Sequence, residues 1–282
     1  MSLLRDRLVF QDNRTSLHLP YKFPVLLPFE QDFDPVPPTV FFQRAWHHSV
    51  TISAIYLALC YLGIGWMRER KPFELRAALI VWNWALALFS LVGTARCLEE
   101  AVAAVREHGF AATLCWGTEP WQPAAYWSLL FAVSKVVELG DTAFLVLRKR
   151  PVIFLHWYHH VTVLVFVWHS GAELTAAGRW FVVVNFFVHS LMYAYFALRA
   201  MGVRIAKGIS MCVTSLQLSQ MLLGVYIIAR VAHFKWQQRP CQQSYQNIAL
   251  GAAIYSSYFV LFGKFFADAY LRNKGAKKTK AD

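Results

Sequence analysis

Histidines at helical spacing are the clearest chemical signal in this sequence. His156, His159 and His160 lie within five residues, at the start of a largely apolar stretch. Residues at i, i+3 and i+4 share one face of a helix, so the three imidazoles can point into one cavity. Such a group either binds a metal ion or handles protons and acyl groups. Apolar packing alone does not explain three histidines in this arrangement.

A second group of ionisable residues interrupts another apolar stretch. Lys135, Glu138 and Thr142 follow at i, i+3 and i+7, and Asp141 lies one turn from Glu138. Each ionisable group inside a membrane span costs roughly 2.5–3.5 kcal/mol on insertion scales, which makes each one a functional candidate. The alternative is a buried ion pair that neutralises itself and only holds helices together.

Two further apolar stretches carry polar groups at helical spacing. They are Asn185, His189 and Tyr193 in one stretch, and Thr214, Gln217 and Gln220 in the other. Taken singly, the aromatic residues are ordinary packing, and amides often serve as contacts between helices. Four stretches that all present polar groups at this spacing favour one polar site inside a helix bundle.

The composition indicates the elements that carry these residues. Of 282 residues, 57% are hydrophobic and 16% charged, whereas soluble domains have about 25% charged residues. This excludes a disordered chain and argues against a soluble one. A membrane span needs about 20 apolar residues, and the stretches that qualify lie at 48–66, 76–95, 124–147, 152–169, 180–199, 209–231 and 248–271. We therefore predict an all-α integral membrane protein with seven transmembrane helices.

The positions of the cations predict the orientation. The chain has 28 Lys and Arg against 16 Asp and Glu, a net charge of +12. In a soluble protein this excess would suggest nucleic acid, but here the cations gather in the connections after the first, third, fifth and seventh spans. By the positive-inside rule those connections and the C-terminus are cytoplasmic. We expect a lumenal tail (1–47), a seven-helix domain (48–271) and a basic cytoplasmic tail (272–282), with no nucleic-acid partner.

Three smaller features fit this topology. Asn13 begins a glycosylation sequon in the lumenal tail. Cys115 and Cys241 lie in connections assigned to the oxidising lumen, so we expect a disulfide between them. Lys278 and Lys280, near the C-terminus, resemble the dilysine retrieval signal of endoplasmic reticulum membrane proteins. The alternative for the lysines is a solvated basic tail that binds anionic lipid.

Two chemistries compete for the polar site. A histidine-box di-iron desaturase or hydroxylase would also contain a His-x-x-His-His run, but it needs about eight ligating histidines, and only four of the ten here lie in the polar stretches. The other chemistry is acyl transfer without a metal, in which an imidazole accepts the acyl group as a nucleophile and neighbouring donors stabilise the oxyanion. A transporter or receptor with seven spans is a third possibility, which the histidine group disfavours.

Taken in order, these motifs resemble those of the fatty acid elongases, the elongation of very long chain fatty acids proteins. The motifs that carry the resemblance are Lys135-x-x-Glu138-x-x-Asp141-Thr142, His156-x-x-His159-His160, Asn185-x-x-x-His189-x-x-Met192-Tyr193, and Thr214-x-x-Gln217-x-x-Gln220. Trp157 and Tyr158 in the histidine motif look most like the branch of proteins 3 and 6, which is associated with saturated and monounsaturated chains.

The resemblance implies an endoplasmic reticulum enzyme that condenses long-chain acyl-CoA with malonyl-CoA. The products are 3-oxoacyl-CoA, carbon dioxide and CoA, and no cofactor is needed. It implies His159 as the nucleophile that forms an acyl-imidazole, with His189 orienting the acyl or malonyl group. His156 and His160 would position groups or relay protons. Spans two to seven would enclose a tunnel for the acyl chain.

The resemblance also gives the cytoplasmic cations a role. Lys149, Arg150, Arg204 and Lys207 flank the expected mouth of the site, where they are candidates to receive the phosphates of CoA. The alternative is that they only set topology beside lipid headgroups. The expected partners are the membrane lipid, the reductases and dehydratase of the elongation cycle, and a second copy or a related elongase.

Overall fold

The computed structural model describes residues 17–271, and long helices dominate this range. They are α3 (His48–Met67), α4 (Arg76–Cys115), α5 (Pro123–Val137), α6 (Gly140–Leu147), α7 (Phe154–Ala172), α8 (Gly178–Ala200), α9 (Lys207–Trp236) and α10 (Tyr245–Phe266), which continues into a π-helical turn (Ala267–Leu271). Shorter elements are β1 (His18–Leu19), a 3₁₀ turn (Pro28–Glu30), α2 (Val36–Ala45) and β2 (Gly117–Thr118). The expected features at Asn13, Lys278 and Lys280, and the tail 272–282, lie outside the described residues.

Every apolar stretch expected to form a span is helical, but two differ from the expected bounds. The second span extends to Cys115, but as two helical segments that meet in a kink at Gly109, where φ is +77°. The third is divided into α5 and α6 at Glu138 and Leu139. Length and hydropathy make five helices able to cross a membrane: α3, α4, α8, α9 and the continuous α10 segment Tyr245–Leu271. The protein is therefore a multi-pass membrane protein.

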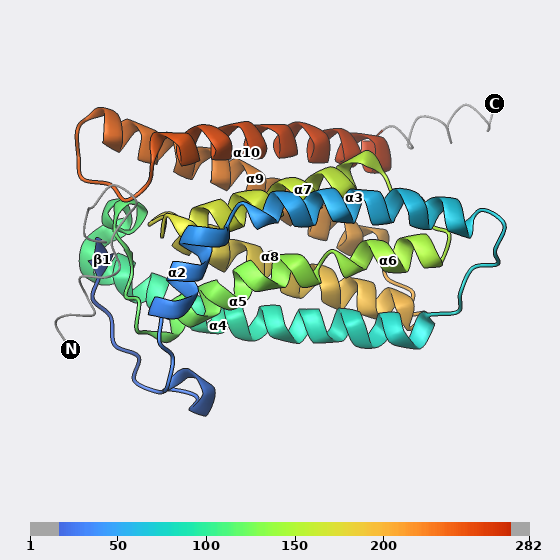
Figure 1. Cartoon of the computed structure of the whole chain (residues 1–282), viewed down its shortest axis with the longest axis horizontal. Helices are drawn as coiled ribbons and strands as arrows, with labels where there is room; N and C mark the ends of the chain where they lie inside the picture. Colours follow the sequence, from blue (N-terminus) through green and yellow to red (C-terminus); the bar gives the residue numbers. More distant parts are fainter. Residues whose placement is uncertain (1–16, 272–282) are drawn as a thin grey trace.

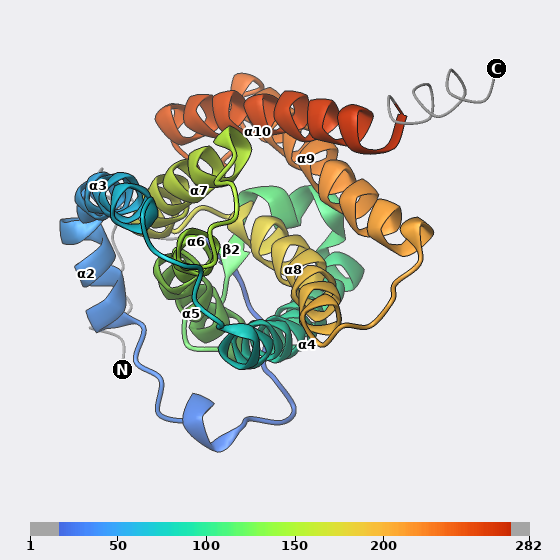
Figure 2. The same cartoon turned by 90° about the vertical axis from the view of Figure 1, so that its right-hand side faces the viewer.

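Six of the elements pack in a closed ring, seen end-on in Figure 2. Going round it, α4 contacts α5, α5 contacts α7, α7 contacts α10, α10 contacts α9, α9 contacts α8, and α8 returns to α4. The first helix of the series, α3, lies outside the ring and packs on α6 and α7. The polar stretches identified from the sequence thus lie on members of one ring, as two adjacent pairs, α5 with α7 and α8 with α9.

Glycine permits the closest helix contacts in this ring. A Cβ added at Gly224 of α9 would lie 2.2 Å from the ring of Tyr255 on α10, and one added at Gly93 of α4 would lie 2.7 Å from Phe186 on α8. Any side chain at these two positions would therefore force the helices apart. Small residues are the usual means by which membrane helices approach one another closely.

One end of the bundle, which we call the disulfide end, is closed by connections from all parts of the chain (Figure 1). Cys115 at the end of α4 and Cys241 before α10 form a disulfide there. Next to Cys241, the Gln242 side chain accepts a hydrogen bond from the Leu17 N–H and donates one to the Leu174 carbonyl. β1 pairs in parallel with β2 at the same end. The expected lumenal tail is thus folded onto the bundle from residue 17 onward.

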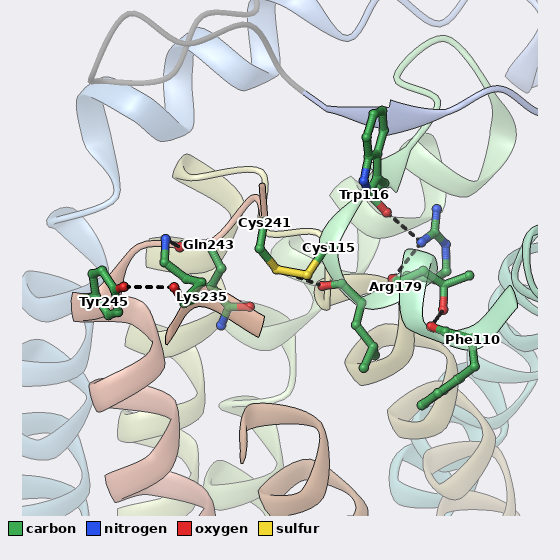
Figure 3. Close-up of a disulfide and its surroundings, with 10 residues drawn as sticks. Phe110, Cys115, Trp116, Arg179, Lys235, Cys241, Gln243 and Tyr245 are labelled. Carbon is green, nitrogen blue, oxygen red and sulfur yellow. Dashed lines mark hydrogen bonds between the residues drawn. A yellow bond between two sulfur atoms is a disulfide. The ribbon is translucent and has the colours of Figure 1, made fainter. Parts of the chain in front are cut away.

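A buried ion pair lies beneath the disulfide. Arg179 of α8 donates to both carboxylate oxygens of Glu100 on α4, at 2.8–3.1 Å. It also donates to the carbonyls of Thr113, Trp116 and Gly117 at 2.8–2.9 Å. Figure 3 shows Arg179 next to Trp116, close to the disulfide. Because the guanidinium has five donors and every one of its nitrogens is bonded, this charge is well compensated.

Glu30 fastens the N-terminal segment to the bundle. Its carboxylate accepts hydrogen bonds from Arg96 of α4 at 2.6 and 2.9 Å and from the Trp127 indole of α5 at 2.8 Å. Burial acts to raise the pKa of Glu30, but the hydrogen bonds from Arg96, the Leu27 N–H and Trp127 outweigh it, and the pKa is lowered. Residues 28–45 are thereby held across the disulfide end.

Candidate active site

Lys135 and Glu138 form the centre of the polar site inside the ring. The Lys135 Nζ lies 2.7 Å from Glu138 Oε1 and 3.0 Å from Asn185 Oδ1 of α8, and both charged side chains are buried. Ser134 donates to the same Glu138 oxygen at 3.0 Å. The two residues meet because they lie three apart at the end of α5, where Glu138 is still in the helical conformation. A neutral pair of this kind can orient neighbouring groups without leaving an unbalanced charge in the bundle.

Asp141 has different hydrogen-bond partners from Lys135. Its two carboxylate oxygens accept hydrogen bonds from the Trp82 indole of α4 at 2.6 Å and from the Tyr193 hydroxyl of α8 at 2.8 Å. Asp141 therefore joins α6 to α4 and α8. The three-residue spacing of Lys135, Glu138 and Asp141 places them close together along the chain, but the structure gives Asp141 the role of a cross-helix acceptor.

The three histidines of α7 form a continuous series of ring contacts. The His156 and His160 rings meet edge to face with centroids 4.5 Å apart, and the His159 and His160 centroids are 5.6 Å apart. His160 is buried, whereas His156 and His159 are partly exposed. Pro151 precedes the helix, and the extended backbone at Ile153 starts it just before the first histidine. The histidines therefore lie in the first turns of α7, beside the Lys135–Glu138 pair.

Aromatic residues of α10 surround His159. Its imidazole centroid is 5.1 Å from the Tyr258 ring and 6.3 Å from the Phe262 ring. The Tyr258 hydroxyl also donates to the His159 carbonyl at 3.2 Å and lies 2.6 Å from the Thr162 hydroxyl. The ring of His159 is therefore held in an aromatic setting.

His189 of α8 reaches the same site from the opposite helix. Its Nδ1 is 3.7 Å from Glu138 Oε2, and its ring packs against Tyr193 at a centroid distance of 5.5 Å. Asn185 lies one turn earlier on α8 and binds Lys135. The structure therefore brings together the residues of α5, α6, α7 and α8 that the sequence identified.

The α9 residues are less closely connected to this site. Thr214 bonds to the Ser210 carbonyl of its own helix and lies 3.3 Å from the Tyr270 hydroxyl. Gln217 donates to the Met192 sulfur of α8 at 3.2 Å, and Gln220 is buried further along the helix. Within residues 17–271, neither Thr214 nor Gln217 hydrogen-bonds to the histidines or to the Lys135–Glu138 pair.

The cations expected to meet CoA lie at the end of the bundle opposite the disulfide, and they differ in their surroundings. Lys149 donates to the carbonyls of Arg68 and Arg70 at 2.9 and 3.1 Å, which fastens α6 to the end of α3. Arg150, Arg204 and Lys207 are exposed. Lys207 lies over the Tyr270 ring at 5.9 Å. Lys149 has a structural contact, whereas Arg204 and Arg150 extend from the surface.

A cavity of about 190 Å³ extends from the disulfide end into the ring. Its inner wall includes Phe131 and Ala132 of α5, Phe166 of α7 and Val182 of α8. Phe131 separates it from the polar site, since the Lys135 Nζ lies 4.2 Å from that ring. Residues of the N-terminal segment, among them Pro38 and Phe42, line its outer part.

Sequence reasoning missed three residues that contact the site. Trp82 binds Asp141, Tyr258 packs on His159, and Tyr56 of α3 lies 2.7 Å from the Thr142 hydroxyl. For Tyr56 a signal existed: Ser49, Ser53 and Tyr56 recur at i, i+4 and i+7 and predict one polar face on α3. Nothing in the sequence distinguishes Trp82 or Tyr258 from the many other aromatic residues.

Fold and site define a helical multi-pass membrane protein with a histidine and ion-pair site enclosed in a six-membered ring. The chain belongs to the ELO family, described as GNS1/SUR4, whose family model matches residues 41–278. It is similar to "Putative fatty acid elongase 4" of Caenorhabditis elegans, at 46% identity over 97% of this chain and 94% of the relative. It is also similar to "Very long chain fatty acid elongase 6" of Drosophila melanogaster, at 43% identity over 88% and 80%. "Very long chain fatty acid elongase 3" of Homo sapiens is 40% identical over 86% and 89%.

Proposed function

We propose that this protein is a fatty acid elongase that condenses a long-chain acyl-CoA with malonyl-CoA. The family membership and the relatives' names support fatty acid elongation by an acyltransferase-type condensing enzyme. The observation that carries the proposal is the histidine series of α7, with the partly exposed residue His159, beside a buried Lys135–Glu138 pair. An apolar cavity reaches into the ring from the disulfide end. This arrangement provides a nucleophile, hydrogen-bond donors and space for an apolar chain.

The reaction proceeds in two steps that together take up one proton from solvent. In the first, a ring nitrogen of His159 attacks the thioester carbonyl, the C–S bond breaks, and CoA leaves with the proton as a thiol. In the second, malonyl-CoA loses carbon dioxide, and the electrons of that C–C bond form an enolate. The enolate carbon attacks the acyl carbon and displaces the imidazolate. The imidazolate takes up a proton from solvent, and the product is 3-oxoacyl-CoA.

The surrounding residues have distinct roles in these steps. Lys135 and Asn185 donate hydrogen bonds to the oxyanion or enolate, and Glu138 holds the Lys135 ammonium in place. His189 orients the acyl or malonyl group, and His156 and His160 fix the ring of His159 and relay protons. Asp141, with Tyr193, keeps α6 and α8 in register. Thr214, Gln217 and Gln220 form the α9 wall on the substrate path.

The acyl chain occupies a tunnel inside the ring formed by the second to seventh spans. The ring order of α4 to α10 and the cavity at the disulfide end support this tunnel. The N-terminal segment closes it, since Pro38 and Phe42 line the outer part of the cavity. In this arrangement α5 with α6 and α7 also cross the membrane, which gives seven spans.

The disulfide end is lumenal and the opposite end cytoplasmic. A disulfide between Cys115 and Cys241 supports an oxidising compartment at the first end. We assign the protein to the endoplasmic reticulum membrane, with Asn13 glycosylated in the lumenal tail and Lys278 and Lys280 as a retrieval signal. There it works with the reductases and dehydratase that process its product, as a homo-oligomer or with a related elongase.

The cytoplasmic cations receive the CoA phosphates. Arg150, Arg204 and Lys207 are exposed at that end, and Lys149 offers its remaining donor beside them. Charge reversal at Arg204 or Lys207 is expected to raise the KM for both CoA substrates with little change in kcat. An unchanged KM would remove these residues from the CoA site.

The reaction uses no metal. The Glu138 carboxylate, a candidate ligand for a metal in this site, is already paired with the Lys135 ammonium at 2.7 Å, which disfavours a metal here. Elongase activity is therefore expected to persist in protein purified with a strong chelator. A di-iron desaturase would instead contain iron in proportion to protein and lose activity with the chelator.

Product analysis tests the proposed function. Purified protein is incubated with malonyl-CoA and a series of saturated, monounsaturated and polyunsaturated acyl-CoAs, and products are identified by mass spectrometry. We expect 3-oxoacyl-CoA two carbons longer than the substrate, from saturated and monounsaturated chains above all. In a second assay without malonyl-CoA, wild-type protein is expected to release one CoA per active site, and His159→Ala none. Release by His159→Ala at the normal rate would argue against the acyl-imidazole.

A further inference from the structure

The outer helix α3 contributes a single side chain to the polar site. Most of α3 is exposed, and its buried residues are Ser49, Ser53, Tyr56 and Met67. Ser49, Ser53 and Tyr56 lie on one face, which packs on α6 and α7. The two serine hydroxyls are buried without a hydrogen-bond partner in the described part of the chain. Tyr56 differs because its hydroxyl extends to α6.

Tyr56 begins a chain of hydrogen bonds that ends on a histidine of the site. Its hydroxyl lies 2.7 Å from the Thr142 Oγ1, and the same Oγ1 lies 2.8 Å from His156 Nε2. Thr142 is almost fully buried at 1% exposure, so water does not readily replace either partner. The Cys60 thiol, one turn further along α3, also contacts Tyr56, but a thiol is a weak hydrogen-bonding group.

The chemistry of a hydroxyl couples the two bonds. Thr142 has one proton, so when it donates to His156 Nε2 it must accept from Tyr56, and when it accepts from His156 its proton is available to Tyr56. The Tyr56 hydroxyl therefore completes the chain in both directions. Loss of that hydroxyl frees Thr142 to turn its proton elsewhere and loosens the ring of His156.

We propose that Tyr56 is a positioning residue of the active site, acting on the histidine series through Thr142. His156 packs on His160 at 4.5 Å, and His160 packs on His159 at 5.6 Å, so the orientation of one ring constrains the next. The inference rests on the proposed function of His159. It gives α3, which lies outside the ring, a part in forming the site.

The experiment compares hydroxyl deletions on the same face of α3. Tyr56→Phe keeps the ring and removes only the hydroxyl, and Ser53→Ala is the matched control because it removes a hydroxyl with no partner. Thr142→Val breaks the chain at its centre, and Thr142→Ser restores it. Each protein is measured for kcat, for the KM of both CoA substrates, for CoA release without malonyl-CoA, and for melting temperature.

We expect Tyr56→Phe to lower kcat and the rate of CoA release by about ten- to a hundredfold, with KM and melting temperature close to wild type. Ser53→Ala is expected to match wild type, and Thr142→Ser to retain most of the activity. The double variant Tyr56→Phe/Thr142→Val should be no slower than Thr142→Val alone, because both act through one chain of hydrogen bonds.

Two results would overturn the inference while leaving the proposed function intact. One is a Tyr56→Phe protein with the kcat of wild type. The other is a loss of kcat that follows a lower melting temperature and adds to the effect of Thr142→Val, which would show a structural role only. If the wild-type protein elongates no acyl-CoA, the proposed function itself fails, a result that is distinct from both.

Discussion

The disulfide end and the histidine site inside the ring both bury charged residues, but the surroundings of these charges differ. At the disulfide end, Arg179 has all its nitrogens bonded to Glu100 and backbone carbonyls, and Gln242 is bonded through both its side chain and its backbone. In the histidine site, Lys135 meets Glu138 and Asn185, while His159 stays partly exposed and His189 is 3.7 Å from its carboxylate. Fully satisfied groups stabilise a fold, whereas groups with remaining capacity are free to bind a substrate.

A comparison of two histidines on α7 gives the largest expected effect. His159→Ala should lower kcat at least about a thousandfold, since it removes the nucleophile, with little change in folding. His169, ten residues later, binds Asn247 and Glu173 at the disulfide end. His169→Ala should lower the free energy of unfolding by about 1–3 kcal/mol and leave kcat nearly unchanged. If the two variants had comparable kcat values, the assignment of catalysis to the histidine site and of stability to the disulfide end would be wrong.

The two buried ion pairs provide the next test. Arg179→Met leaves Glu100 uncompensated and should lower the free energy of unfolding by about 3–5 kcal/mol, measured by denaturant titration in micelles. Replacing both partners, Arg179→Met with Glu100→Leu, should restore part of that stability. The recovery stays incomplete because Arg179 also binds three carbonyls.

Lys135→Met should also destabilise the protein, and Lys135→Met with Glu138→Leu should again recover stability. The difference lies in activity: we expect the double variant at Lys135 and Glu138 to remain inactive, whereas the folded double variant at Arg179 and Glu100 keeps its kcat. Activity in the former would show that the Lys135 pair is structural only.

The disulfide should contribute stability without contributing to catalysis. Cys115→Ser with Cys241→Ser opens a link between residues 126 positions apart. We expect a loss of about 2–4 kcal/mol in the free energy of unfolding and a kcat within about twofold of wild type while the protein stays folded. Cys212→Ser is the matched control, since Cys212 is free and exposed. A loss of kcat in protein that stays folded would show that the disulfide end and the histidine site are coupled.

The smallest effect concerns the attachment of the N-terminal segment. Because the pKa of Glu30 is lowered in the folded protein, its contribution is present above the ordinary glutamate pKa of about 4.3. It is lost as the pH falls through that lowered pKa. Hydrogen exchange of residues 28–45 should therefore increase on acidification, after correction for the intrinsic rate. In Glu30→Gln the same segment should exchange faster at neutral pH and show no such change with pH.

Much of the fold and of the site could be predicted from the sequence because the signals are local. Apolar stretches of about 20 residues fixed the helices, and i, i+3 and i+4 spacing placed His156, His159 and His160 on one face. Polar groups at helical spacing on four apolar stretches predicted one site inside a bundle, to which α5, α6, α7 and α8 contribute. The break in the third span was not predicted, because Glu138 and Leu139 interrupt the helix without a proline.

The tertiary structure alone decided which partners these side chains meet. That Asp141 binds Trp82 and Tyr193, that Lys149 caps α3, and that Tyr56 reaches Thr142 from outside the ring depend on the rotation and packing of separate helices. Periodicity within one helix carries no information about how that helix is rotated or packed against another. The sequence by itself therefore determined the chemical groups and the helices that carry them, and helix packing determined which groups face a substrate and which hold the bundle together.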